Sequence, residues 1–369
     1  MSTISRAISL DAPSLGSDEK RFLNTAVDEG YVSSVGRFVT DFEDEFARYL
    51  EVKNSVSTQS GTAAIHMALY ELGIGKDDEV IVPALTFVAT VNPVVYLGAK
   101  PVFADIDSRT WNIDPEDIER LITKKTKAII PVHLYGNPCD MRAIMKLAKR
   151  YSLHVIEDAT ESLGAVYQDR YTGTFGVFGC FSFNGNKTIT TGGGGMVVGR
   201  DAKKINHIKF LVNQAKDEIN SLYHPEIGFN YRMTNIEAAL GLAQFKRLDR
   251  FLDKKNEINS IYKKELTGLN SIHFQEEYAG ARSSHWFTCV SFGRKINIPR
   301  LQKKLRKRGI PTRRIFMPIN GFPPYRKYRS GACEHSRNLY DTGLCLPSSV
   351  LNSTRDISYV AKTIKGLVG

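Results

Sequence analysis

Residues 182–196 read SFNGNKTITTGGGGM, and this stretch decides how the sequence around it is interpreted. It begins at the end of an apolar strand predicted over Cys180–Phe183, so that Ser182 and Lys187 leave the strand together. The four glycines at 192–195 permit close backbone approach and positive φ. A partly desolvated lysine at such a strand end loses its proton more readily, as Schiff-base chemistry requires. The alternative is a surface lysine in a glycine-rich hairpin, and the pattern by itself leaves both open.

Short apolar runs alternate with helix-period segments on both sides of this stretch. The predicted strands are Glu79–Val82, Lys100–Ala104, Ala128–Val132, His154–Glu157, Cys180–Phe183 and Gly195–Val198. The predicted helices include Thr62–Glu71, Phe87–Leu97 and Met141–Tyr151. This alternation predicts an α/β fold in which a mostly parallel sheet is covered by helices on both faces. A ligand is then expected beyond the carboxyl ends of the strands.

A capping-box sequence, Thr234-Asn-Ile-Glu237, precedes a long helical pattern that runs to about Leu266. We expect this helix to connect two domains. Residues 1–266 would form a large domain with an N-terminal arm, and residues 267–369 a small C-terminal α/β domain. The smaller domain is predicted to contain an extended segment at His285–Phe292, an amphipathic helix at Pro299–Gly309, an extended segment at Thr312–Phe316 and a helix at Thr354–Lys365.

Two acidic residues end the strand before the lysine stretch, in the sequence VIEDATES at 155–162. Asp158 therefore lies where a ligand is expected in an α/β sheet, and Glu161 follows three residues later in the sequence. A carboxylate at Asp158 would keep a pyridine nitrogen protonated and so make the ring an electron sink. The alternative is that Glu157 or Asp158 caps a following helix.

Two further polar segments precede helical patterns. Residues 57–66 read STQSGTAAIH, and the backbone amides of Gly61 and Thr62 would lie at a helix N-terminus, which binds phosphate. An ordinary N-cap is the alternative. Residues 85–90 read LTFVAT, where Phe87 either stacks on a flat cofactor or belongs to the core.

The length and composition favour a globular protein with large cores. The 369 residues suit a large and a small domain, and 42% hydrophobic and 24% charged residues are ordinary values. No stretch resembles a membrane span and residues 1–15 lack a signal-peptide pattern, so we expect a cytoplasmic protein without membrane association. The five cysteines are odd in number, widely spaced and without a CxxC pair. We expect buried thiols and no metal site.

The net charge of +11 raises the possibility of nucleic-acid binding. The densest basic cluster, Lys303 to Arg314, begins on the amphipathic stretch, where a solvated helix face is an equally good interpretation. No zinc-finger spacing, RNP motif or heptad repeat accompanies the charge. We therefore expect no nucleic-acid partner.

The order and spacing of these pieces resemble the DegT/DnrJ/EryC1/StrS sugar aminotransferases, a branch of the fold-type I enzymes that use pyridoxal 5′-phosphate (PLP). The resemblance spans nearly the whole chain. It rests on the segments GYVSSVG (30–36), SGTAA (60–64), PALTFVAT (83–90), GAKPVFAD (98–105), HLYG (133–136), EDA (157–159), the lysine stretch and GFNYRMTNIEAALG (228–241).

The resemblance implies a role for each site residue. Lys187 would bind the cofactor as a Schiff base, Asp158 would pair with the pyridinium and Phe87 would stack on the ring. Gly61, Thr62 and Ser182 would hold the phosphate, together with Asn230 of the partner subunit in a homodimer with shared active sites. Many members have glutamine in place of Glu161, near the cofactor's phenolic oxygen. The carboxylate departs from that pattern, and contact with the substrate is its alternative role.

The implied reaction has two halves. L-glutamate would give its amino group to the cofactor, and the cofactor would pass it to a ketone of a nucleotide-linked sugar. Lys187 would carry protons between substrate and cofactor. Because this position is a lysine, the dehydratases of the family, which have histidine there, are disfavoured.

The motifs are most similar to the subgroup that acts on UDP-linked 4-keto-6-deoxy-N-acetyl sugars. Arg313 and Arg314, in the segment PTRRIF at 311–316, are the predicted diphosphate or sugar contacts, with surface arginines as the alternative. GDP-linked substrates of perosamine synthases and 3-keto sugars remain rival substrates. A nucleotide-sugar binding or regulatory protein without catalysis is the rival from another class.

Overall fold

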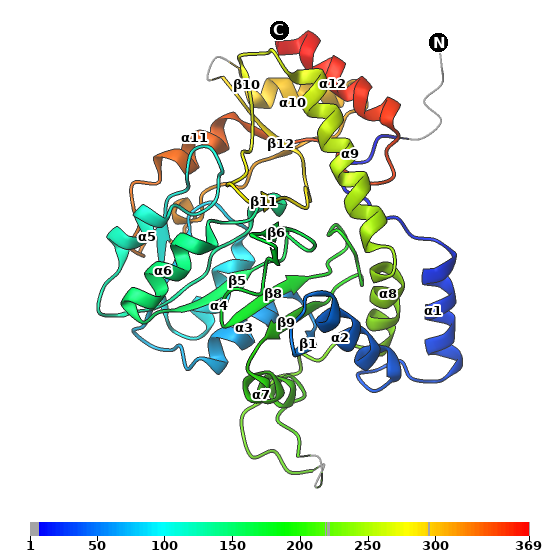
Figure 1. The fold of residues 1–369 in the computed structure, drawn as a ribbon, viewed down its shortest axis with the longest axis vertical. Helices are drawn as coiled ribbons and strands as arrows, with labels where there is room; N and C mark the ends of the chain where they lie inside the picture. Colours follow the sequence, from blue (N-terminus) through cyan, green and yellow to red (C-terminus); the bar gives the residue numbers. More distant parts are fainter. Residues whose placement is uncertain (1–6, 218, 220–221, 294–295, 369) are drawn as a thin grey trace.

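A seven-stranded sheet forms the centre of the computed structural model, which describes residues 7–217, 219, 222–293 and 296–368 (Figure 1). In spatial order its strands are β1 (Asn54–Thr58), β9 (Gly195–Gly199), β8 (Phe178–Ser182), β5 (His154–Asp158), β4 (Thr126–Ile129), β2 (Glu79–Pro83) and β3 (Lys100–Ala104). The strands from β8 to β3 are parallel to their neighbours, whereas β9 and β1 are added antiparallel at one end. The mostly parallel sheet expected from the sequence is confirmed.

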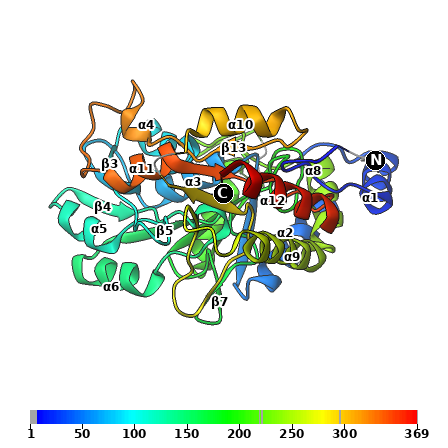
Figure 2. The ribbon, with the colours of Figure 1, turned by 90° about the horizontal axis from the view of Figure 1, so that it is seen from above.

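Helices cover both faces of this sheet because its strands are apolar on both sides. In β2, Val80 and Val82 pack toward one face and Ile81 toward the other. The first face is covered by α3 (Gly61–Glu71), α4 (Asn92–Tyr96) and α7 (Ala202–Val212). The second is covered by α5 (Pro115–Leu121) and α6 (Met141–Tyr151) at one end, and by α1 (Ser17–Asp28), α2 (Arg37–Tyr49) and α8 (Asn235–Phe245) at the other. Figure 2 shows α4 and α6 on opposite sides of the strands.

Two predicted helices are each broken in two. The predicted helix Phe87–Leu97 is a 3-10 turn at Val88–Thr90 followed by α4. The break has a physical cause, since Pro93 has no N–H to donate to the preceding turn. The helix from Thr234 is capped as predicted, with Thr234 Oγ1 accepting from the backbone N–H of Glu237 at 3.3 Å. It ends at Phe245, and α9 (Leu248–Leu266) continues after a turn.

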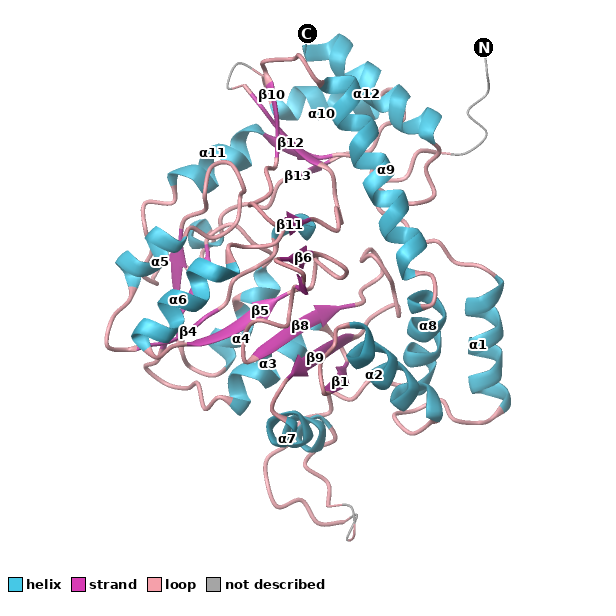
Figure 3. Ribbon diagram, viewed as in Figure 1, coloured by secondary structure: helices cyan, strands magenta, loops and turns pink. Residues whose placement is uncertain are grey.

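A second, antiparallel sheet lies at the far end of α9 (Figure 3). Its strand order is β10 (Ile272–Phe274), β12 (Cys289–Phe292), β14 (Gly343–Cys345) and β13 (Arg313–Arg314). It packs in a core with α9, α10 (Ile298–Arg306) and α12 (Thr354–Val368), and α11 (Glu334–Thr342) precedes β14. A small third sheet consists of β11 (Ala281–Arg282), β6 (Val166–Tyr167) and β7 (Arg170–Tyr171).

The segment from Ile8 to Ser14 lies against the C-terminal part of the chain. Ile8 is buried in the core that α9, α10 and α12 share. The backbone of Ser9 exchanges two hydrogen bonds with the side-chain amide of Asn352, at 2.9 and 2.7 Å. Leu10 O accepts from the backbone N–H of Ser348 at 2.8 Å. Ser9 is therefore joined to a residue 343 positions later in the chain.

The division at residue 266 stays a prediction, and two segments cross it. Besides Ile8 on the C-terminal side, Ile319 and Tyr325 pack into the core of the seven-stranded sheet. All five cysteines are buried and free, as expected. Within the described ranges, no helix has the length and apolar character needed to span a bilayer.

Candidate active site

A cavity of about 410 Å³ opens at the carboxyl ends of the central strands. Of the residues that the sequence singles out, Gly61, Thr62, Phe87, Asp158, Glu161, Ser182, Lys187 and Arg313 line it. These residues come from α3, from β5 and β8, from the segments that follow β2 and β5, and from the β8–β9 connection and β13. The location matches the expectation for a parallel sheet.

Asp158 ends β5 and points into the cavity. The residue is only 2% exposed, and its Oδ2 accepts a hydrogen bond from Thr90 Oγ1 at 2.7 Å. Oδ1 accepts from the backbone N–H of Thr160 at 3.1 Å. The hydroxyl of Thr86 lies 2.9 Å from that of Thr90, which extends the chain of hydrogen bonds. The segment after β5 forms turns and no helix, so neither Glu157 nor Asp158 is a helix cap.

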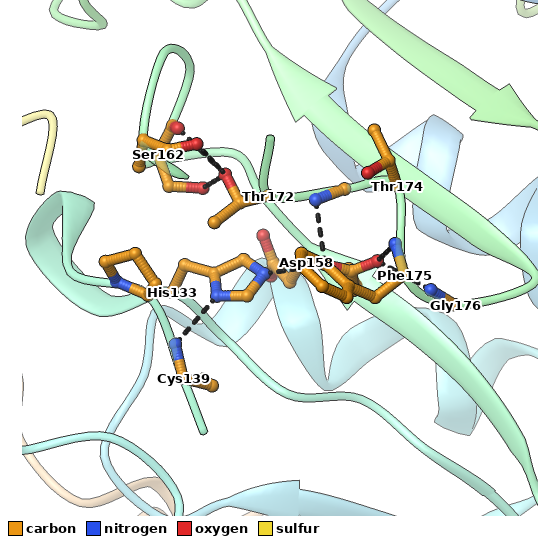
Figure 4. A network of polar contacts seen from close by, with 12 residues as sticks. His133, Cys139, Asp158, Ser162, Thr172, Thr174, Phe175 and Gly176 are labelled. Atoms are coloured by element: carbon orange, nitrogen blue, oxygen red, sulfur yellow. Dashed lines mark hydrogen bonds and ion pairs between the residues drawn. The ribbon is translucent and has the colours of Figure 1, made fainter. Parts of the chain in front are cut away.

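Glu157 points to the opposite side of β5 and is fully enclosed. Its carboxylate accepts backbone N–H bonds from Gly173, Phe175 and Gly176 at 2.8, 2.6 and 2.7 Å. His133 Nε2 lies 3.0 Å from Oε2, and Figure 4 shows His133 at one side of this network with Phe175 and Gly176 at the other. The backbone N–H of Cys139 donates to His133 Nδ1 at 3.0 Å, so the ring carries its proton on Nε2 and donates it to Glu157. Every oxygen of this carboxylate is used within the protein.

Lys187 lies in the connection between β8 and β9, and its side chain is only 13% exposed. Nζ is 3.8 Å from Glu161 Oε1 and 3.9 Å from the centre of the Trp286 ring. Burial lowers the pKa of Lys187, and the charges of Glu161 and Asp158 oppose that shift only in part. The lysine is thus easier to deprotonate than a free one.

Glu161 is fixed by a strained piece of backbone. Its Oε2 accepts from the backbone N–H of Tyr135 at 2.8 Å, and Tyr135 has a φ of 56°. A bulky residue in this left-handed region is a strained conformation. The pKa of Glu161 is raised above its ordinary value by burial. The charge of Lys187 and the hydrogen bond from the Tyr135 N–H oppose this shift in part. The Glu161 carboxyl thus faces Lys187 from a fixed position.

The N-terminus of α3 provides a site for an anion. Ser60 is the N-cap and accepts from the backbone N–H of Ala63, while the first amides of any helix have no partner within it. Gly61 has no room for a side chain, because a Cβ would lie 2.9 Å from both Ser182 Cβ and Thr160 Cγ2. The Ser182 side chain therefore lies close to the backbone amides at this helix N-terminus.

The two neighbouring arginines of β13 point in different directions. Arg313 lines the cavity, and its Nε and Nη2 are buried without a hydrogen-bond partner among the described residues. Arg314 instead donates to the carbonyl of Tyr340 at 2.5 Å and lies over that ring. Alternation along a strand separates them, so only one of the two predicted substrate contacts reaches the cavity.

Asn230 lies away from this cavity. It is exposed and its backbone pairs with Asn213 in an isolated bridge, in the connection between α7 and α8. Within a single chain, Asn230 is not among the described residues that line the cavity.

Several lining residues carry no signal in the sequence. The aromatic residues Trp286 and Phe316 form part of the wall, and Thr90 and Asn186 line it as well. Trp286 donates from Nε1 to the carbonyl of Asn186 at 2.8 Å. An aromatic residue in an extended segment is usually core, so only its contact with Lys187 distinguishes Trp286.

The arrangement fits PLP. A helix N-terminus closed by Gly61 suits a phosphate, a buried carboxylate suits a pyridine nitrogen, and a lysine with a lowered pKa suits an aldehyde. Phe87, 54% exposed at the mouth, offers a flat face. No group of three or more His, Cys, Asp or Glu in the described ranges is arranged to hold a metal ion.

Comparison with known proteins assigns the whole chain to one group. Residues 13–365 match the model of the DegT/DnrJ/EryC1/StrS aminotransferase family. The chain is 41% identical to the GDP-perosamine synthase of Escherichia coli O157:H7, over 95% of this chain and 96% of that one. It is also 41% identical to the GDP-perosamine synthase of Caulobacter vibrioides, over 96% of each. Helicobacter pylori PseC, an aminotransferase involved in the biosynthesis of pseudoaminic acid, superposes with a TM-score of 0.92 at 26% identity, over 98% of this chain and 99% of that one.

Proposed function

The chain belongs to the DegT/DnrJ/EryC1/StrS aminotransferase family, and from this premise we propose that it transfers the amino group of L-glutamate to the keto group of a nucleotide-linked sugar. It is a PLP-dependent sugar aminotransferase, as the members of this family are. The observation that carries the proposal is the convergence of Lys187, Asp158 and the α3 N-terminus on one cavity.

We infer a role for each residue of the cofactor site. PLP, when bound, supplies an electron sink that makes transfer of an amino group possible. Asp158 holds the ring nitrogen, and the Thr90 and Thr160 bonds keep its carboxylate aimed into the cavity. The amides of Gly61 and Thr62 and the hydroxyl of Ser182 hold the phosphate.

Lys187 binds the aldehyde and moves protons. Its lowered pKa makes the neutral amine available as a base, and the same Nζ returns the proton as an acid. Glu161, 3.8 Å away, stabilises the ammonium form between these two events. Trp286 and Phe316 cover the reacting region and limit the access of water.

The comparisons favour a GDP-linked sugar over the UDP-linked substrate that the sequence motifs suggest. The relatives reported above at 41% identity are both named GDP-perosamine synthase. Arg313 is the proposed contact for the diphosphate, because its buried Nε and Nη2 donors have no hydrogen-bond partner among the residues that the structure describes. Arg314 is left out of this proposal.

The active enzyme is proposed to be a homodimer. Asn230 lies on the surface in the α7–α8 connection, where apolar side chains are also exposed, including Ile227 at 81%. Exposed apolar residues of this kind support contact with another chain. In such a dimer Asn230 would reach the phosphate in the partner's cavity.

An absorbance titration tests the proposal. Wild type and Lys187→Ala are loaded with PLP and mixed with glutamate, then with GDP- and UDP-linked keto sugars. We expect a visible band that glutamate removes in wild type alone and that a GDP-linked sugar restores. Restoration by a UDP-linked sugar instead would reassign the nucleotide. Absence of the band in wild type would leave a nucleotide-sugar binding protein as the better account.

A further inference from the structure

Lys255 is a buried lysine that the proposed reaction does not use. It belongs to α9 and is 7% exposed. Nζ donates to the carbonyl of Trp286 at 2.9 Å and to that of Ser348 at 3.2 Å. No carboxylate of the described residues lies within 4.0 Å of it. Burial lowers its pKa to about 8, and the charge of Asp11 opposes that shift.

A buried ammonium without an ion-pair partner is costly, so its contacts need a reason. One of the two carbonyls that it binds belongs to the residue whose ring lies against Lys187. The other belongs to the C-terminal segment that also holds Leu10. Lys255 thus connects α9, the cavity wall and the C-terminal segment through one atom.

The backbone of Trp286 is also held at its nitrogen. His285, the preceding residue, has a φ of 47°. Gly136 packs so closely that a Cβ there would lie 2.8 Å from Trp286 N, and its carbonyl accepts from the N–H of Ser284 at 3.0 Å. The loop is therefore contacted by Gly136 at the Trp286 nitrogen and by Lys255 at the Trp286 carbonyl.

We propose that Lys255 is a positioning residue that fixes the Trp286 ring against the Nζ of Lys187. The inference rests on the proposed role of Lys187 as the lysine that binds PLP. Lys255 itself touches neither the cavity nor Lys187 among the described contacts.

Substitution of Lys255 has two possible effects on the pKa of Lys187, and they have opposite signs. A cation over an aromatic ring is stabilised, so a displaced Trp286 would make Lys187 easier to deprotonate. Loss of the Lys255 charge by itself would do the reverse, because removal of a nearby cation raises the pKa of an amine. The charged groups that act on Lys187 are Glu161, Asp158 and Arg313, and none of them is altered. Asp11 acts on Lys255, which in turn acts with Lys263 on His285.

The experiment follows PLP uptake by the cofactor-free protein at a fixed pH where Lys187 is mostly protonated. The rate at which the visible band appears reports the neutral fraction of Lys187. Lys255→Met should take up PLP about threefold faster than wild type, as expected for a weakened cation–π contact. Lys254→Met is the matched control, because its ammonium pairs with Glu257 on the solvent side of the same helix, and its rate should equal that of wild type. Lys255→Arg should restore the wild-type rate.

A double-mutant comparison tests whether Lys255 acts through Trp286. Trp286→Phe should accelerate uptake similarly, and Lys255→Met should add nothing in that background. Equal rates for Lys255→Met and Lys254→Met, slower uptake by Lys255→Met, or additive effects would each overturn the inference while leaving the proposed function intact. If Lys255→Met does not fold, Lys255→Gln takes its place with the same expectation. Failure of wild type to take up PLP would overturn the proposed function, and the inference with it.

Discussion

Glu157 and Asp158 are consecutive residues on β5, yet they lie in opposite environments. Glu157 faces a closed region where three backbone amides and His133 occupy its oxygens. Asp158 lines the cavity, and its carboxylate accepts hydrogen bonds from Thr90 and Thr160. Both residues are buried, at 0% and 2% exposure, so burial does not distinguish them.

The difference lies in how completely each carboxylate is satisfied. A buried carboxylate with all its acceptors filled stabilises the fold, because removal of its charge would leave several donors unpaired. A buried carboxylate that is oriented but retains an open side is suited to bind something that enters. Substitutions on the two sides should therefore affect different measurements.

Substitutions of cavity-lining residues should lower the activity of the protein without lowering its stability, and the largest loss is expected at Lys187. Lys187→Ala removes the amine that binds the aldehyde and carries the proton, and turnover of glutamate should fall by at least about 10³-fold. The melting temperature should stay within a few degrees of wild type. Lys204→Ala, at a partly exposed lysine of α7, is the control and should retain activity. Comparable losses in both variants would remove Lys187 from the mechanism.

Asp158→Asn should lower the rate by about 10²-fold to 10³-fold, because an uncharged amide no longer keeps the ring nitrogen protonated. Stability should change little, since the amide oxygen still accepts from one of its two donors. Steady-state kinetics together with thermal unfolding provide both readouts. A variant that melts early and keeps its rate would place Asp158 with Glu157 as a structural carboxylate.

Glu157→Gln is the reciprocal substitution on the same strand. The NH₂ group of the new glutamine would face either the backbone N–H groups of Phe175 and Gly176 or the N–H of His133. Because donors would then face donors, the free energy of unfolding should fall by about 2–4 kcal/mol. Denaturant unfolding measures this change. The rate per folded, loaded molecule should stay within severalfold of wild type, and a rate loss as large as that of Asp158→Asn would contradict the comparison.

Gly61→Ala tests the packed end of the cavity. The new Cβ would press on Ser182 and Thr160, and movement of either should weaken PLP binding by about tenfold. Equilibrium titration of the visible band measures the affinity. Gly75→Ala is the matched control, because a Cβ there meets nothing within 4 Å, and it should bind PLP normally.

The smallest effect is expected at Glu161. Its charge raises the pKa of Lys187, so Glu161→Gln should lower that pKa further and increase the neutral fraction at any pH below it. PLP uptake by the cofactor-free protein should then reach half its maximum rate at a lower pH than in wild type. An unchanged or upward-shifted profile would show that the carboxylate does not act on Lys187.

Local patterns were sufficient to predict the parts that depend on local periodicity. The apolar run before Asp158 and the strand before Ser182 identified two strand ends, and parallel strands bring such ends to one edge. The Thr234 capping box was recognisable because its two hydrogen bonds join residues three apart. Residue roles beyond these placements depended on family resemblance and stay predictions until tested.

Contacts between distant segments were beyond the reach of the same patterns. Arg313 and Arg314 are equivalent in sequence, and only the register of β13 against β14 decides which one faces the cavity. Trp286 reaches Lys187 because His285 and Gly136 adopt positive φ in two loops about 150 residues apart, which periodicity does not encode. The sequence does not predict β1, because four of its five residues are polar and its partner β9 lies far along the chain.

The seating of the segment from Ile8 to Ser14 has a consequence for how the protein is made. Because a ribosome synthesises a chain from its N-terminal side, this segment emerges well before Ser348 and Asn352, which hold it, and Ser9 precedes Asn352 by 343 positions. Asp11, which contacts Asn186 at 3.1 Å and Arg313 at 3.6 Å, therefore takes its position at the cavity rim only after Ser348 and Asn352 have been synthesised. A nascent chain can assemble its central sheet early, but its catalytic pocket is complete only after the segment that contains Ser348 and Asn352 has emerged.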